Sequence, residues 1–201
     1  MMARGLLITV SGASGTGKGT VCKRLLDTTP ELIYSISATT RAPRAGELDG
    51  REYFFFTRDQ FIDKIKRNEF LEYADVYGNY YGTLRSYVDG QRDAGRDVLL
   101  EIDTQGALKV QKACPDGVFI FLLPPSLEEL KQRIIGRGTE SPESLSKRLS
   151  AAPVEIEIGR QYDYAVVNDS IENAVEKIKA IIVAEHCRVA RSAELFDTFK
   201  S

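Results

Sequence analysis

The chain has 201 residues, enough for one domain with a sizeable core and small insertions but not for two full domains. A formal net charge of −2 and an ordinary composition give no indication of a nucleic-acid or membrane-surface partner. No apolar run approaches the ~20 residues that span a bilayer, no signal peptide precedes the first strand, and the three cysteines are far apart. We therefore expect a cytoplasmic protein with reduced thiols.

Short apolar runs alternate with helical patterns along the chain. In chain order, the expected strands are residues 6–10, 34–37, 98–102, 118–123 and 165–167. Their nearly continuous hydrophobicity is typical of parallel strands that are covered on both faces. Helices are expected after Thr57 and Ser126, each followed three residues later by a Gln or Glu that completes a capping box, and from residue 171, where apolar residues recur with a 3.6-residue period. This alternation predicts an α/β fold with a doubly wound parallel sheet.

Two stretches do not fit such a core. Residues 38–83 are rich in Arg, Gly, Tyr and Phe, which predicts a small mixed α+β insertion. Residues 126–153 are polar and rich in Arg, with Gly136-Arg137-Gly138 in the middle. This composition is more typical of a mobile helical lid than of a packed layer.

A glycine-rich loop follows the first expected strand and precedes a helical pattern. Its sequence, Gly12-Ala13-Ser14-Gly15-Thr16-Gly17-Lys18, has the G-x-x-x-x-G-K spacing of a P-loop in the required strand–loop–helix context. The glycines let backbone N–H groups surround a phosphate, and the lysine can reach the β- and γ-phosphates. The spacing does not match the G-x-G-x-x-G of a dinucleotide-binding loop. We therefore predict a P-loop NTPase core.

The residue after Lys18 departs from the usual motif. Gly19 stands where Ser or Thr normally binds Mg²⁺, and the next hydroxyl belongs to Thr20. We therefore expect Mg²⁺ to be held by ATP oxygens and water rather than by the loop, and Thr20 to contact phosphate. No N-K-x-D motif is present, which argues against a GTPase, and the single histidine, His186, has no second His or Cys at metal-ligand spacing.

The longest motif begins within the second expected strand. It reads Ser37-Ala38-Thr39-Thr40-Arg41-Ala42-Pro43-Arg44-Ala45-Gly46-Glu47 and continues through Gly50 and Tyr53. Together with residue 72 and the segments 78–83, 101–106, 136–140 and 147–150, it resembles the guanylate kinase family over nearly the whole chain. The resemblance implies an ATP-binding core (1–33, 84–125 and 154–201), a GMP-binding region (34–83) and a lid (126–153). It also implies transfer of a phosphate from ATP to GMP or dGMP.

Four side chains in the GMP-binding region are suited to a monophosphate. Arg41 and Arg44, held three residues apart by Pro43, supply planar guanidinium groups that can bind phosphate oxygens in pairs. Tyr53 and Tyr81 can add hydroxyl donors to the same oxygens. The residue types alone therefore predict a phosphate site separate from the P-loop.

The resemblance assigns the remaining site residues. It places Glu72 at the N1–H and N2–H₂ edge of guanine, with hydroxyl contacts from Ser37 and Thr83 and a second acceptor in Asp103. For ATP it implies Ala13, Ser14, Gly15, Thr16, Gly17, Lys18, Gly19, Thr20, Arg133, Arg137 and Asn168. Because the accepting phosphate oxygen is already anionic, no general base is needed. Catalysis then rests on Mg²⁺ and on the positive charges of Lys18, Arg44, Arg137 and Arg148.

Two other functions remain as alternatives. One is a nucleoside monophosphate kinase for AMP, dTMP or UMP, against which Glu72, Thr83 and Asp103 argue. The other is a non-catalytic guanylate-kinase-like domain that binds phosphopeptides, against which the intact loop and lid arginines argue. The tail of residues 188–201 carries Leu195, Phe196 and Phe199, which either pack on the same domain or meet another subunit. A homo-oligomer is therefore left open.

Overall fold

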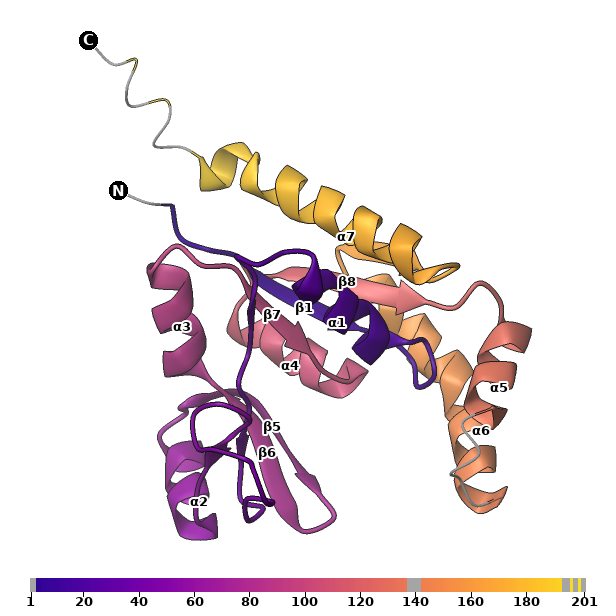
Figure 1. The fold of residues 1–201 in the computed structure, drawn as a ribbon, viewed down its shortest axis with the longest axis horizontal. Coiled ribbons are helices and arrows are strands. Elements are labelled where there is room, and N and C mark those ends of the chain that lie inside the picture. Colours follow the sequence, from indigo (N-terminus) through magenta and orange to yellow (C-terminus); the bar gives the residue numbers. More distant parts are fainter. Residues whose placement is uncertain (1–2, 137–141, 193–195, 197–198, 200–201) are drawn as a thin grey trace.

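A five-stranded parallel sheet forms the centre of this computed structural model, which describes residues 3–136, 142–192, 196 and 199 (Figure 1). In spatial order its strands are β2 (Ile33–Tyr34), β7 (Val98–Glu101), β1 (Leu7–Ser11), β8 (Val118–Leu123) and β9 (Tyr164–Val167). All neighbouring strands are parallel. From β1 the chain runs to the edge strand β2, returns to β7 beside β1, and continues on the other side of β1 through β8 and β9. This arrangement of parallel strands confirms the predicted α/β fold.

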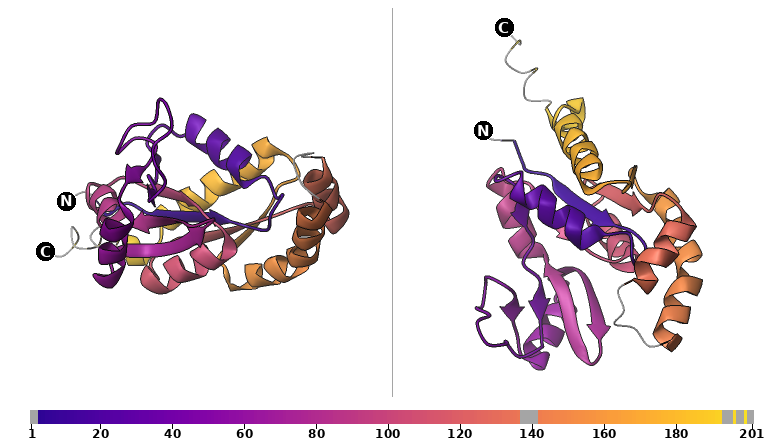
Figure 2. Two further views of the ribbon diagram at one scale, coloured as in Figure 1. Left: turned by 90° about the horizontal axis from the view of Figure 1, so that it is seen from below. Right: turned by 45° about the vertical axis from the view of Figure 1, so that its right-hand side comes forward.

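Alternate residues of these strands belong to two different cores. Ile8 and Ile120 pack with α1 (Lys18–Asp27) and α7 (Ile171–His186) on one face of the sheet. Leu7 and Phe119 pack with α3 (Arg85–Asp93) and α4 (Thr104–Ala113) on the other face. Figure 2 shows the sheet between these two helical layers. Burial on both faces explains why the strands are continuously hydrophobic in sequence.

The expected strands 6–10, 98–102, 118–123 and 165–167 are confirmed with ends shifted by at most one residue. The expected strand at 34–37 was wrong in its extent. β2 ends at Tyr34, and after the Ser35 N–H donates to the Leu99 carbonyl (2.9 Å) the chain leaves the sheet. It leaves because residues 38–39 belong to a second sheet.

This second sheet contains β4 (Phe54–Phe55), β3 (Ala38–Thr39), β6 (Asn79–Leu84) and β5 (Phe70–Val76), in that order. Helix α2 (Arg58–Lys66) covers it through an aromatic cluster centred on the buried Phe61. Both bonds of the expected capping box form between Thr57 and Gln60. The predicted mixed α+β insertion is therefore confirmed.

The segment expected to form the lid contains α5 (Leu127–Ile135) and α6 (Pro142–Ile158). Ser126 caps α5 as predicted, but the carboxylate of Glu129 accepts a hydrogen bond from Arg133 instead of completing the capping box. The two helices share an apolar cluster that includes Ile134, Ala152 and Ala13 of the glycine-rich loop. A few apolar residues on the two helices form this cluster, and the assignment of residues 126–153 to a lid stays a prediction.

Two short 3-10 helices complete the elements: η1 (Gly159–Gln161) lies before β9 and η2 (Val189–Arg191) follows α7. In the tail, Phe196 and Phe199 are exposed, and Leu195 lies outside the described residues. None of the helices in the described part of the chain has both the length and the apolar character that a bilayer crossing requires.

Candidate active site

The loop between β1 and α1 turns sharply at its glycines. Gly15 and Gly17 have φ angles of 89° and 90°, a region that L side chains rarely adopt. A Cβ atom would lie 2.7 Å from Ile134 Cγ1 at position 15 and 2.6 Å from Asn168 Nδ2 at position 17. Both the backbone conformation and these close approaches therefore require glycine.

Lys18 begins α1, whose N-cap residue is Gly17 and offers no capping side chain. The first N–H groups of this helix therefore point out of its N-terminus, where an anion is favoured. The Lys18 ammonium donates to the carbonyls of Gly12 (2.6 Å) and Ala13 (3.2 Å). Burial lowers the pKa of Lys18, while the nearby carboxylates of Glu101 and others act in the opposite direction.

The side chains of Ala13 and Thr16 are buried within the loop. The Thr16 hydroxyl donates to the Ala13 carbonyl at 2.9 Å, and the Thr16 N–H donates to the same carbonyl at 3.3 Å. Of the residues expected to bind ATP, these two can therefore contribute through the shape of the loop rather than through their side chains.

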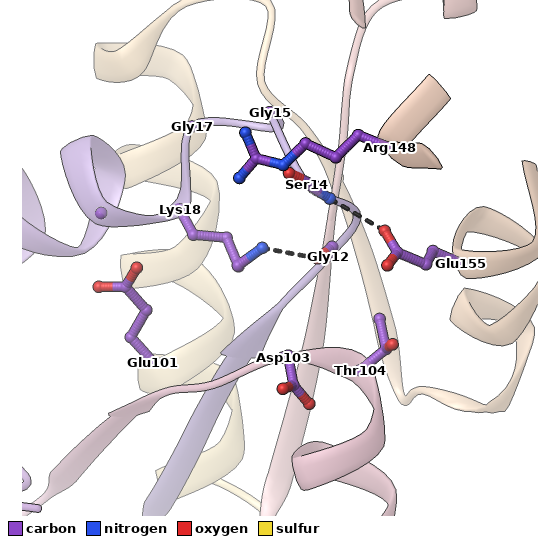
Figure 3. Close-up of a pocket in the computed structure, with 11 residues that line it drawn as sticks. Gly12, Ser14, Gly15, Gly17, Lys18, Glu101, Asp103, Thr104, Arg148 and Glu155 are labelled. Atoms are coloured by element: carbon purple, nitrogen blue, oxygen red, sulfur yellow. Dashed lines mark hydrogen bonds between the residues drawn. The ribbon is translucent and has the colours of Figure 1, made fainter. Parts of the chain in front are cut away.

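A cleft of about 290 Å³ opens beside the loop (Figure 3). Its walls are Gly12, Ser14, Gly15, Gly17, Lys18, Gly19, Glu101, Asp103, Thr104, Arg148 and Glu155. The structure thus brings together two of the predicted cationic side chains, Lys18 from α1 and Arg148 from α6. Two carboxylates in these walls, those of Glu101 and Glu155, were not among the predicted site residues. The position of Glu101 could have been predicted to lie near the loop, because it is the last residue of an apolar strand that pairs with β1.

A second cleft of about 340 Å³ adjoins the first at Gly17. It contains three further residues expected at the ATP site: Thr20, Arg133 and Asn168. Asn168 donates from Nδ2 to the Thr16 carbonyl (2.8 Å), and its own carbonyl accepts from Arg133 (3.1 Å). Asn168 therefore holds the loop from the side of β9 in addition to lining this cleft.

Just after β3, Arg41 lies close to the phosphate-binding candidates Tyr53 and Tyr81. Its guanidinium carbon lies 5.4 Å from the centre of the Tyr53 ring, and that ring is 6.1 Å from the ring of Tyr81. Glu47 accepts from Arg41 Nη2 at 2.9 Å and from the Arg44 backbone N–H at 2.7 Å. The hydrogen bond to Glu47 also raises the pKa of Arg41. Glu47 was part of the motif, but its bridging role was missed.

Glu72 and Thr83 are directly opposite each other on β5 and β6. The Thr83 hydroxyl donates to Glu72 Oε1 at 2.8 Å. Burial raises the pKa of Glu72, and this hydrogen bond offsets part of the rise. Asp103 Oδ1 accepts from the N–H of Gly106 (2.7 Å) and caps α4. A Cβ atom at Gly106 would be 3.4 Å from an oxygen of both Asp103 and Glu72, so the two carboxylates face the same point.

The matching family model is that of guanylate kinase, over residues 4–185. The chain belongs to the guanylate kinase family. It is 58% identical over 191 residues to the guanylate kinase of Clostridium perfringens (strain 13 / Type A), covering 95% of this chain and 88% of that protein. It is 54% identical over 193 residues to the guanylate kinase of Halalkalibacterium halodurans, covering 96% of this chain and 95% of that protein. The crystal structure of guanylate kinase from Anaplasma phagocytophilum is similar in fold, with a TM-score of 0.70 and 35% identity over 94% of this chain and 90% of that one.

Within this guanylate kinase fold, the remaining predicted residues are less closely gathered. The Arg44 side chain is exposed, and only its backbone joins the Glu47 contact. Ser37 is half-buried, and its carbonyl accepts the N–H of Phe54 (2.9 Å). Arg137 lies outside the described residues. Among the residues that the structure describes, no three His, Cys, Asp or Glu side chains form a group that could hold a metal ion.

Proposed function

We propose that this chain transfers the terminal phosphoryl group of ATP to GMP or dGMP, as expected of a guanylate kinase in purine nucleotide metabolism. The observation that carries the choice of base is the half-buried Glu72, which accepts a hydrogen bond from Thr83 and faces the same glycine as Asp103. A carboxylate accepts the N1–H and N2–H₂ donors of guanine. Adenine presents an acceptor at N1, which a carboxylate disfavours.

The ATP phosphates bind on the glycine-rich loop in this proposal. The N-terminus of α1 supplies backbone N–H groups and Lys18 supplies a positive charge. The nucleoside extends into the adjoining cleft, where Arg133 and Asn168 lie. The shared wall at Gly17 supports this assignment, because one molecule can occupy both clefts.

The phosphate of GMP binds to Arg41, Tyr53 and Tyr81. Arg41 contacts Glu47, the Ala42 carbonyl and Tyr81, and its five N–H donors leave some for a phosphate. Arg44, exposed and already tied to Glu47 through its backbone, turns its side chain onto the same phosphate.

The chemical step then needs alignment and positive charge rather than a base, because a phosphate oxygen of GMP is itself the nucleophile. Lys18 and Arg148 face one cleft from opposite sides and can stabilise the charge on the transferring group. We assign Arg44 and Arg137 to the same task. We assign to residues 126–153 the role of a lid whose closure limits the access of water to this cleft.

The residues present fit a Mg²⁺ ion that arrives with ATP. The carboxylate of Glu101 is 3.4 Å from the position of a Cβ atom at Gly19, so it faces the cleft where the motif usually has a hydroxyl. Mg²⁺ commonly binds one or two carboxylates while keeping phosphate oxygens and water. When bound, the ion neutralises charge on the phosphates. Glu101 would hold it directly or through water.

The three cysteines of the chain are free, which supports the proposal that the enzyme works in the reducing cytoplasm. Sizing chromatography tests whether the chain forms a homo-oligomer, which the sequence of the tail leaves open.

A coupled assay of ADP formation with GMP, dGMP, AMP, dTMP and UMP tests the proposed function. We expect turnover with GMP and dGMP, and loss of that turnover in Lys18→Met. Preferred turnover with AMP, dTMP or UMP would contradict the assignment of guanine to Glu72.

A further inference from the structure

A carboxylate from α6 contacts the glycine-rich loop directly. Oε2 of Glu155 accepts a hydrogen bond from the backbone N–H of Ser14 at 3.0 Å (Figure 3). Glu155 also lines the cleft that contains Lys18 and contributes to its electrostatic surroundings. An acidic side chain is unexpected on a loop that binds anions, so its presence calls for a structural or mechanistic reason.

The loop N–H groups divide into two sets. The N–H of Ser14 is used by Glu155, and the N–H of Thr16 donates to the Ala13 carbonyl. The N–H groups of α1 begin with Lys18 and lie at the helix N-terminus. The loop therefore contacts α6 through its first part and presents its later part to phosphate.

Glu155 and Arg148 lie seven residues apart on α6. Seven residues are about two helical turns, or roughly 10 Å along the axis, so the two side chains share one face of the helix. Both line the same cleft, as Figure 3 shows. An apolar cluster that includes Ala152 and Ala13 packs α6 near the loop, but apolar contacts are not directional. The charge-assisted hydrogen bond of Glu155 is directional and fixes the rotation of the helix.

We propose that Glu155 is a positioning residue, which locks α6 onto the glycine-rich loop so that Arg148 meets the transferring phosphoryl group. This inference rests on the proposed function. Ser14 then serves ATP binding by anchoring the lid helix rather than by contacting phosphate. A different role, in which Glu155 competes with ATP for the loop, has the opposite signature, because its removal would tighten ATP binding.

Steady-state kinetics of the full chain tests this proposal with Glu155→Ala, Glu155→Gln and the matched control Glu157→Gln. Glu157 lies on the same helix but is exposed and pairs with Arg160. We expect Glu155→Ala to lower kcat by about tenfold to a hundredfold, the effect of losing one hydrogen bond to a charged group. The KM for GMP should stay within about twofold, the loss in Glu155→Gln should be smaller because an acceptor oxygen remains, and Glu157→Gln should match the wild type.

A double-mutant cycle with Arg148→Ala separates positioning from a general structural role. If Glu155 acts through Arg148, Glu155→Ala should lower kcat by less than about threefold in the Arg148→Ala background. Three results would each overturn the proposal. Glu155→Ala could lower kcat by its full factor in the Arg148→Ala background, it could leave kcat equal to that of the Glu157→Gln control, or it could tighten ATP binding measured by calorimetry. If Glu155→Ala has a lower melting temperature than the wild type, the same double-mutant cycle is measured with Glu155→Gln. A wild-type chain that makes no GDP would instead overturn the proposed function.

Discussion

Replacing Glu72 with Gln tests guanine recognition at a single oxygen. In the structure, Oε1 of Glu72 already accepts from the Thr83 hydroxyl. In Glu72→Gln the amide oxygen keeps that contact and the NH₂ group faces the N1–H and N2–H₂ donors of guanine. A hydrogen bond to a charged group contributes about 1.5–3 kcal/mol, and a buried unpaired donor costs about 1–3 kcal/mol. Together these contributions reach about 2.5–6 kcal/mol, so we expect kcat/KM for GMP to fall roughly 10²- to 10⁴-fold.

The same variant should raise kcat/KM for AMP, because the new NH₂ group can donate to N1 of adenine. The measurement is the ratio of kcat/KM for GMP to that for AMP, with Glu69→Gln as a control on the same segment, where the carboxylate pairs with Lys64 on the surface. Burial raises the pKa of Glu72, so removing its charge should not lower the melting temperature. A GMP-to-AMP ratio equal to that of the wild type would refute the role of Glu72.

Three further predictions concern other parts of the molecule. Arg41→Met should raise the KM for GMP about a hundredfold and leave the KM for ATP within about twofold, as initial rates would show; equal losses for both substrates would instead indicate misfolding. Glu72 binds guanine when ionised, and burial raises its pKa. The KM for GMP should therefore rise as the pH falls, and the rise should begin at a higher pH than for an ordinary carboxyl group. In Glu72→Gln this part of the pH profile should vanish. Burial favours the neutral form of Asp116, but hydrogen bonds from Arg92 and Cys114 outweigh it and lower its pKa to about 2. That stabilisation is complete above the ordinary carboxyl pKa and is lost as the pH falls towards 2. At neutral pH, urea unfolding of Asp116→Asn should therefore show a loss of about 1–2 kcal/mol in the free energy of unfolding, a value reduced because the carboxylate is half-exposed. Unchanged stability would contradict the pairing of Asp116 with Arg92.

Local patterns in the sequence predicted much of the fold for direct physical reasons. Parallel strands covered on both faces need apolar residues at every position, so the runs around β1, β7 and β8 were identifiable. Thr57 and Gln60 form a capping box whose two bonds depend only on neighbouring residues. The glycine-rich loop was equally clear from its spacing after an apolar strand, because positive φ angles and close contacts at Gly15 and Gly17 disfavour residues with a Cβ atom.

Long-range contacts account for what the sequence did not reveal. The bond between Glu155 and Ser14 joins residues 141 positions apart, and no spacing rule relates them. The end of β2 at Tyr34 depends on where the second sheet begins rather than on the apolar character of residues 35–37. Glu47 was visible in its motif, but its two bonds to the Arg41 and Arg44 region follow from a turn that sequence reasoning did not resolve.

The most direct test of the account is to measure both products of the proposed reaction. ATP, Mg²⁺ and the full chain are incubated with and without GMP, and ADP and GDP are quantified by chromatography over time. The account predicts ADP and GDP in equal amounts when GMP is present and little ADP when it is absent, because the phosphoryl group passes to GMP rather than to water. ADP formed without GDP, or at the same rate without GMP, would contradict it.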